Sequence, residues 1–211
     1  GQPKAAYKIF KCTLTFALVS GGIGALLIFF GAGFFSDVLV NTPESKLALQ
    51  VLAPTILVVA VMGCMRGYFQ GLGTMVPTAV SQIVEQIINA AVSIGAAYVL
   101  FHYGLKIDAV LGTKTAAYAY GAAGSTLGTG LGALSGLLFL AFLVAAYRHV
   151  MRRKMAVSRE ERREESTAEI YYMLILTIMP VILSTAVYNL SGIIDQGIFK
   201  HLMALKNYDS M

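Results

Sequence analysis

The sequence contains little charge and little cysteine. Only 13% of its 211 residues are charged, whereas a soluble domain has roughly 25%, and 57% are apolar. This balance excludes an ordinary soluble protein and predicts an integral membrane protein. The two cysteines, Cys12 and Cys64, lie alone in apolar runs without CxxC spacing. They therefore indicate neither a metal site nor a redox pair, and we expect both to pack as small apolar side chains.

Other sequence signals are also absent. The three histidines, His102, His149 and His201, are isolated and have no paired spacing for a metal, so we expect no metal and no cofactor. The opening "GQPKAAYKIFK" begins with glycine and lacks the apolar core and cleavage site of a signal peptide. We expect the chain to be an internal piece of a longer protein.

Long apolar runs dominate what is present. A membrane-spanning helix needs about 20 mostly apolar residues. Windows of that kind predict an all-α, polytopic membrane protein with five transmembrane helices, at residues 12–35, 47–70, 77–101, 116–147 and 170–199. Start signals support several boundaries: Thr42 with Pro43, Pro77, and the capping boxes formed by Ser166 with Glu169 and by Ser158 with Glu161.

The basic residues divide unevenly between the two sides that five spans create. One side receives five, namely Lys46, Lys106, Lys114, Lys200 and Lys206. The other receives eleven, namely Lys4, Lys8, Lys11, Arg66, Arg148, Arg152, Arg153, Lys154, Arg159, Arg162 and Arg163. The positive-inside bias predicts that the richer side, with the amino end, is cytoplasmic.

The basic run "RHVMRRKMAVSREERREES" does not indicate a nucleic-acid partner. Its lysine and arginine residues are mixed with four glutamates, and no aromatic residues suitable for base stacking accompany them. Topology and anionic lipid headgroups explain the run, so membrane lipids are the expected partner.

Small residues form a ladder in the fourth span. Gly124, Gly128, Gly132 and Gly136 lie on one helix face as overlapping GxxxG units, which lets two helix backbones approach closely in lipid. The overlapping "GTGLGA" resembles a dinucleotide fingerprint, but no strand precedes it and no soluble βαβ unit surrounds it. Helix packing is therefore the preferred interpretation.

Ionisable residues inside the spans need an explanation, because a charge at the bilayer centre costs roughly 2.5 to 3.5 kcal/mol. Arg66 lies about one turn before the end of the second span, and Glu85 about two turns into the antiparallel third. The depths match, so we predict that the two side chains approach each other near the cytoplasmic face. Both a structural clasp and a part of a transport pathway are open interpretations of this pair.

Further polar residues lie near Glu85 and in the fifth span. Gln82, Gln86 and Asn89 share most of one face with Glu85, and we expect this face to look into the protein or a cavity. Asn189 and Asp195 lie about 1.7 turns apart in the fifth span. The candidate residues for cavity lining or ion coupling are Arg66, Gln82, Glu85, Asn89, Asn189 and Asp195.

The chain resembles a known transporter family. The resemblance rests on "RGYFQGLGTMVPTAVSQIVEQ" at residues 66–86, the preceding "LAPTILVVAVMG", the lead-in "KAAYKIFK" and "MPVILSTAVYNLSGIID" in the last span. These segments resemble the polysaccharide-biosynthesis branch of the multidrug/oligosaccharidyl-lipid/polysaccharide (MOP) flippase superfamily, in particular its stage V sporulation protein B-like and YtgP-like lipid flippases.

The resemblance implies a fold of about fourteen helices in two lobes, of which these five look like the third to the seventh. Residues 1–147 would belong to the amino-terminal lobe, 148–169 to the cytoplasmic inter-lobe loop, and 170–211 to the first helix and outer-side tail of the second lobe. In related lipid II flippases, cationic residues on the first helices meet the substrate's pyrophosphate. Those helices are missing here, so no such residue is carried over.

The resemblance also implies a function without covalent chemistry. The protein would move an undecaprenyl-linked sugar intermediate or peptidoglycan precursor across the bacterial cytoplasmic membrane by alternating access, together with the remaining helices of the full-length chain. A drug or cation antiporter of the multidrug and toxin extrusion (MATE) branch is the alternative. A glycosyltransferase is disfavoured, because the outer loops near 36–46 and 102–115 offer only scattered acids: Asp37, Glu44 and Asp108. A non-transporting scaffold would use the glycine ladder as its interface with a partner protein.

Overall fold

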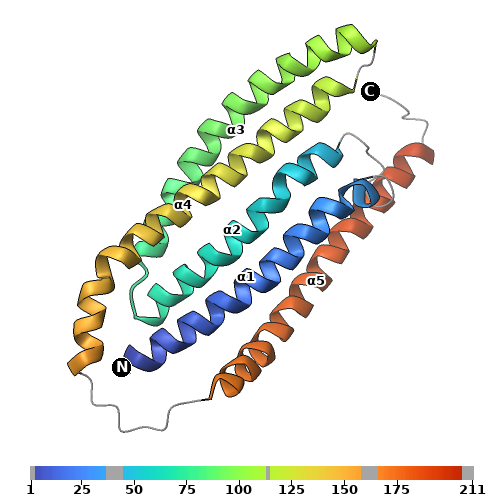
Figure 1. Cartoon of the computed structure of the whole chain (residues 1–211). Coiled ribbons are helices and arrows are strands. Elements are labelled where there is room, and N and C mark those ends of the chain that lie inside the picture. The colour runs from blue at the N-terminus through green and yellow to red at the C-terminus, as the bar shows by residue number, and fades with distance from the viewer. Residues whose placement is uncertain (1–2, 37–44, 113–114, 158–165, 206–211) are drawn as a thin grey trace. The chain divides into compact units, whose positions relative to one another are not determined.

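The computed structural model describes residues 3–36, 45–112, 115–157 and 166–205. Five helices account for nearly all of them: α1 (Pro3–Phe34), α2 (Ser45–Gly71), α3 (Val76–Leu111), α4 (Ala116–Val157) and α5 (Thr167–Leu205) (Figure 1). Each is long and apolar enough to cross a membrane. The prediction of an all-α fold with five spans is confirmed.

The chain divides into two compact units. The first, Gly1–Arg163, contains α1 to α4, and the second, Glu164–Met211, contains α5. The predicted cap of α5 is present, because the Ser166 backbone N–H donates to Glu169 Oε2 at 2.8 Å. The predicted start signals at Thr42 and Pro43, and at Ser158 and Glu161, lie outside the described residues.

Several helices continue beyond their predicted spans. α1 begins at Pro3 rather than residue 12, and α3 ends at Leu111 rather than residue 101. Hydropathy marks where a helix is apolar, whereas the helix itself ends where the backbone changes conformation. In α3 that point is Gly112, whose φ of 68° is left-handed and whose N–H donates to Asp108 O at 2.8 Å.

The four helices of the first unit do not pack in their sequence order. α1 packs against α2, α2 against α4, and α4 against α3, whereas α2 and α3 contact each other only briefly (Figure 1). α4 therefore lies between α2 and α3. Since α2 ends where α3 begins, we call this the α2–α3 end of the unit, and the opposite end the α3–α4 end.

The two faces of α4 pack in different ways. Toward α2, large side chains form the core, in which Met62, Phe69 and Leu140 are buried together with Ala133. Toward α3, the packing surface is the glycine ladder. A Cβ built on Gly124 would lie 2.5 Å from Ala96 O, and one on Gly132 would lie 2.8 Å from the Asn89 Cβ. No side chain fits at these contacts.

The predicted close helix approach is therefore confirmed, with α3 as the neighbour of the ladder. Gly128, in the middle of the ladder, lies directly against the Ser93 backbone. The hypothesis that this face serves as an interface for a partner protein is wrong, because α3 of the same unit occupies it.

A left-handed glycine and a proline shape the turn between α2 and α3. Gly73 has a φ of 82°, a left-handed conformation in which glycine is unstrained. The Thr74 N–H donates to Phe69 O at 3.2 Å and the Gly73 N–H to Gln70 O at 2.9 Å, which is the Schellman pattern. Pro77 lies in the first turn of α3, as predicted.

Candidate functional site

The contact between Arg66 and Glu85 that the sequence predicts is confirmed. Arg66 Nη2 lies 2.6 Å from Glu85 Oε2 and donates a hydrogen bond to it. The two side chains are 16% and 18% exposed, so the ion pair is largely removed from solvent within this unit. It joins α2 to α3 near the turn that connects them.

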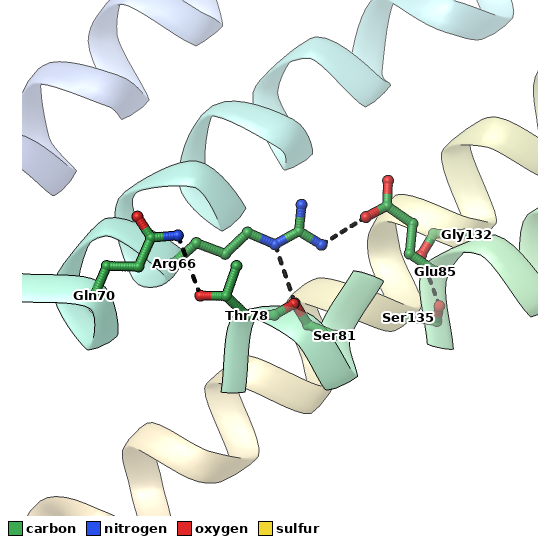
Figure 2. A network of polar contacts seen from close by, with 7 residues as sticks. All are labelled: Arg66, Gln70, Thr78, Ser81, Glu85, Gly132 and Ser135. Carbon is green, nitrogen blue, oxygen red and sulfur yellow. Dashed lines mark hydrogen bonds and ion pairs between the residues drawn. The ribbon is translucent and has the colours of Figure 1, made fainter. Parts of the chain in front are cut away.

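Small polar groups hold the guanidinium in place (Figure 2). Arg66 Nε donates to Ser81 Oγ at 3.0 Å, and this hydroxyl donates in turn to Thr78 O at 2.7 Å. Gln70 Nε2 lies 3.4 Å from Thr78 Oγ1, which extends the network to the last turn of α2. Ser81 is fully buried. The Arg66 side chain is thus oriented by two side chains of α3 that lie four residues apart, the hydroxyl of Ser81 and the carboxylate of Glu85.

Glycines of α4 make room for this arrangement. A Cβ built on Gly136 would lie 3.0 Å from Met62 Sδ and 3.5 Å from the Glu85 Cβ, so this glycine is at the junction of all three helices. At Gly132, a Cβ would lie 2.8 Å from Glu85 O. A larger residue at either position would push α3 away from α4 and separate Arg66 from Glu85.

The other candidates on α3 fall on two different faces. Asn89 is half-buried against Gly132, and its Oδ1 lies 2.9 Å from Ser93 Oγ. Gln82 and Gln86, in contrast, are exposed. The expectation that most of these polar residues share a face that looks into the protein or a cavity stays a prediction for the two glutamines. The helix rotation between Ser81 and Gln82, about 100°, turns the glutamine away from α4.

The remaining candidates belong to the second unit. Asn189 and Asp195 are both exposed on α5. The Asn189 amide donates to Thr185 O at 2.9 Å, a bond within the same helix.

Two parts of this site escape the sequence-based prediction. Ser81 and Ser93 continue a four-residue period through Glu85 and Asn89, which matches the four-residue period of the glycines on α4. This shared period indicates that α3 is the helix that packs against the glycines of α4. Asp108 is the second part: it is buried, and its carboxylate accepts the backbone N–H groups of Ala116 at 3.0 Å and Ala117 at 2.9 Å.

Asp108 therefore caps α4 from the neighbouring helix. It was expected in an outer loop at 102–115, but α3 continues through this position. The first turn of a helix leaves backbone N–H groups without partners and carries a partial positive charge, so a carboxylate is stabilised there. Gly104 allows α3 to approach the start of α4 this closely, since a Cβ built on it would lie 2.6 Å from the Ala117 Cα.

The site as a whole is suited to holding helices together and to presenting polar groups at membrane depth. Hydrogen bonds from a guanidinium to a carboxylate are stronger than those between neutral groups and fix the orientation of both side chains. A charged pair of this kind inside a membrane segment is typical of transport proteins, in which ionisable groups face partners or aqueous cavities.

Comparison with curated proteins supports the same class. The chain is 30% identical over 135 residues to the lipid II flippase MurJ of Bacillus subtilis (strain 168), covering 59% of this chain and 24% of that protein. It is 26% identical over 152 residues to stage V sporulation protein B of the same organism, covering 72% of this chain and 27% of that protein. Both are flippases of the MOP superfamily. They are homologues of this chain.

The resemblance seen in the sequence is thus confirmed, and the homologues are transporters rather than enzymes. The chain spans about a quarter of the length of these two relatives. No family model and no solved structure matches it significantly.

Proposed function

We propose that this chain is part of a flippase that transfers a lipid-linked sugar, namely an undecaprenyl-linked oligosaccharide or peptidoglycan precursor, from the cytoplasmic to the outer leaflet. The observation that carries the proposal is the similarity to two lipid flippases along a chain whose five helices are each suited to cross a membrane. The charged pair at membrane depth is consistent with it.

The proposed position of these helices in the fold follows from the resemblance. Residues 1–147 would form part of the first lobe, 148–169 the cytoplasmic connection, and 170–211 the start of the second lobe. The division of the chain into units Gly1–Arg163 and Glu164–Met211 falls inside this connection, which supports the assignment. The excess of basic residues supports a cytoplasmic position for the α2–α3 end.

Within such a flippase, the candidate residues would have two kinds of role. Arg66 and Glu85 would act as the clasp that keeps α2 and α3 together, since each is engaged by the other helix. Gln82 and Gln86 are exposed beside this clasp and would line the aqueous cavity that the sugar headgroup requires. Asn89 would contribute to the α3–α4 contact, and Asn189 and Asp195 on α5 would be candidates for cavity lining or ion coupling.

The test is a transfer assay with the whole protein that contains this chain. It would be reconstituted in liposomes with a fluorescent undecaprenyl-diphosphate-linked sugar, and the fraction of label accessible to an external quencher would be followed over time. Protein-dependent transfer that is lost in the Arg66→Ala variant is the expected result. Proton exchange driven by small organic cations, without lipid transfer, would instead indicate the antiporter. Covalent change of the sugar would indicate an enzyme.

A further inference from the structure

The tyrosines of α1 to α4 lie at two levels along these helices. At the α2–α3 end, the Tyr68 ring packs against Phe10 with ring centres 4.5 Å apart, and Tyr7 lies one turn before Phe10. Gln70, close to Tyr68 on α2, has its Nε2 3.4 Å from Thr78 Oγ1. These rings are therefore level with the first turn of α3, near Thr78.

The second level is at the α3–α4 end. Tyr103 faces Tyr120 of α4 with ring centres 5.6 Å apart, and Phe101 faces Tyr118 of α4 at 6.1 Å. Tyr98 lies one turn before Phe101. Tyr98, Tyr103 and Tyr118 are each more than half exposed within the unit. This level is therefore a cluster of aromatic side chains on the surface of the α3–α4 hairpin.

The two levels are about as far apart as the two interfaces of a bilayer. Thr78 and Phe101 lie about 35 Å apart along α3, at about 1.5 Å per residue. The hydrocarbon core of a bilayer is about 30 Å thick, and spanning helices are tilted by about 20°. Tyrosine is enriched at membrane–water interfaces. The tyrosines of α1 to α4 all lie at these levels or outside them: Tyr7, Tyr68 and Tyr147 toward the α2–α3 end, and Tyr98, Tyr103, Tyr118 and Tyr120 toward the α3–α4 end.

The helix segments between the two levels contain no unpaired charge. Contacts between helices, such as that of Gly124 with Ala96, align these segments as residues 12–28 of α1, 51–67 of α2, 81–97 of α3 and 123–139 of α4. Their only charged side chains are those of Arg66 and Glu85, which pair with each other. The nearest lysines lie at the tyrosine levels or beyond them, namely Lys11, Lys46 and Lys106. This composition suits a hydrocarbon environment, because an unpaired charge there is costly.

One face of α3 runs past both levels on the side away from α4. Ile83 and Ile87 follow Ser81 and Glu85 by two residues, about 200° of rotation, and those two residues lie toward Gly136 of α4. The exposed positions that continue this face at spacings of three, four or seven residues are Val76, Val80, Ile83, Ile87, Ile94, Tyr98 and Leu105. We call this face the α3 stripe. It is aliphatic up to its tyrosine, as expected for a helix surface that leaves the hydrocarbon at that level.

We propose that the two tyrosine levels lie at the two membrane–water interfaces and that the α3 stripe faces the acyl chains of the bilayer between them. The hydrocarbon would be centred near residue 89 of α3, midway between Thr78 and Phe101. Arg66 and Glu85 would lie roughly 5 to 10 Å inside one interface. At the other interface, the last turns of α3 and the Asp108 cap would lie in the headgroup layer or beyond it. This placement does not depend on the proposed transport activity.

Depth measurements with nitroxide labels along the α3 stripe test this placement. The whole protein that contains this chain would have its cysteines replaced, Cys12 and Cys64 by alanine, and would receive one new cysteine at a time for labelling. It would be reconstituted in vesicles of dioleoylphosphatidylcholine. Oxygen dissolves in hydrocarbon whereas a nickel chelate stays in water, so the ratio of their collision rates with the nitroxide rises with depth. The labelled positions are Val80, Ile87, Ile94 and Tyr98.

The labels should give a depth profile that is symmetric about residue 89. We expect Val80 and Tyr98 to be equally deep within about 3 Å, two residues of helical rise, because they are equally far from residue 89. Ile87 should be the deepest of the four positions. If the membrane were centred instead on the middle of α3, between residues 93 and 94, Ile94 would be the deepest. Tyr98 would then lie about 15 Å deeper than Val80.

A second measurement uses no nitroxide. A membrane-impermeant maleimide, present on both sides of the vesicles, should react with Leu105→Cys but not with Ile94→Cys, since only position 105 lies outside the hydrocarbon. Circular dichroism and gel filtration that match those of the cysteine-free protein would show that each variant is folded. This pair provides the result if a variant at Val80 or Tyr98 does not fold.

Three results would overturn the proposal. The first is a profile in which Ile94 is the deepest position and Tyr98 is deeper than Val80. The second is high nickel accessibility at Ile87 and Ile94, or low accessibility to both reagents there, because the α3 stripe would then face water or another helix rather than acyl chains. The third is protection of Leu105→Cys from the maleimide.

Discussion

The two carboxylates of α3 that contact neighbouring helices are held in different ways. Glu85, near the α2–α3 end, is 18% exposed and binds one side chain, Arg66 of α2. Asp108, at the α3–α4 end, is buried and accepts two backbone N–H groups of α4. One carboxylate can exchange its partner through rotation of a side chain, whereas the other can be released only if a helix end moves.

This difference indicates that the two ends of the unit differ in how easily they can rearrange. The α3–α4 hairpin is closed at the Asp108 end and packed along its length by the glycine ladder, so we expect it to behave as one rigid element. At the other end, α2 is joined to this hairpin by the ion pair with its hydroxyl partners and by the core that contains Met62, Phe69 and Leu140. A rearrangement of the unit is therefore expected at the α2–α3 end, while the α3–α4 end stays closed.

The largest effect is expected from a substitution that reaches both ends at once. Gly128→Leu would place a side chain against the Ser93 backbone in the middle of the hairpin. We expect a loss of more than about 4 kcal/mol in the free energy of unfolding, the range of a severe core clash, measured by denaturant titration in detergent micelles. Gly95→Leu, where a Cβ meets no atom within 4 Å, is the control and should be nearly neutral. Equal effects of the two variants would contradict the assignment of the ladder.

Arg66→Ala tests the α2–α3 end alone. Removal of the guanidinium leaves Glu85 largely buried without its partner, which costs about 3 kcal/mol for buried pairs. The same titration measures the loss, and hydrogen exchange should show faster exchange in the last turns of α2 with little change at Ala116 and Ala117. Uniform acceleration across both ends would mean that the two carboxylates do not act separately.

Asp108→Ala tests the other end. The N–H groups of Ala116 and Ala117 would lose their acceptor, and we expect a loss of about 2 kcal/mol. Asp108→Asn keeps one acceptor oxygen and should lose less. Lys106→Ala, two residues away, serves as the control. An Asp108→Ala protein as stable as the Lys106→Ala protein would show that this cap contributes nothing.

The smallest effect is expected at Ser81, which orients the arginine without carrying charge. Ser81→Ala should lower stability by about 1 kcal/mol, the net contribution of one hydrogen bond. This loss should become smaller in an Arg66→Ala background, because the hydroxyl then keeps only its bond to Thr78 O. A loss that persists unchanged there would assign Ser81 a role independent of Arg66.

Sequence reasoning found one of these carboxylates and missed the other for a physical reason. Arg66 and Glu85 are near a short turn, so their depths along two antiparallel helices fix their proximity. Asp108 caps a helix that begins eight residues later, and its partners are backbone groups that leave no mark in the residue types. Hydropathy also ended the third span too early, since His102 and Lys106 interrupt an apolar run but not a helix.

The order of the helices was the other feature that composition did not predict. Periodicity indicated that one face of α4 packs closely, but not which helix packs there. The matching four-residue periods of Ser81, Glu85, Asn89 and Ser93 on α3 and of the α4 glycines contain that information. They are recognised once the two helices are compared position by position.

A double-mutant cycle on Arg66 and Glu85 is the most direct test of the releasable clasp. Arg66→Met, Glu85→Gln and the double variant would be compared with the unmodified protein for lipid transfer in liposomes. If the two side chains act as one unit, each single variant should slow transfer and the double variant should be no slower than the slower single one. A coupling of about 1.4 kcal/mol, or tenfold in rate, is expected. Effects that multiply, with no coupling, would contradict the clasp.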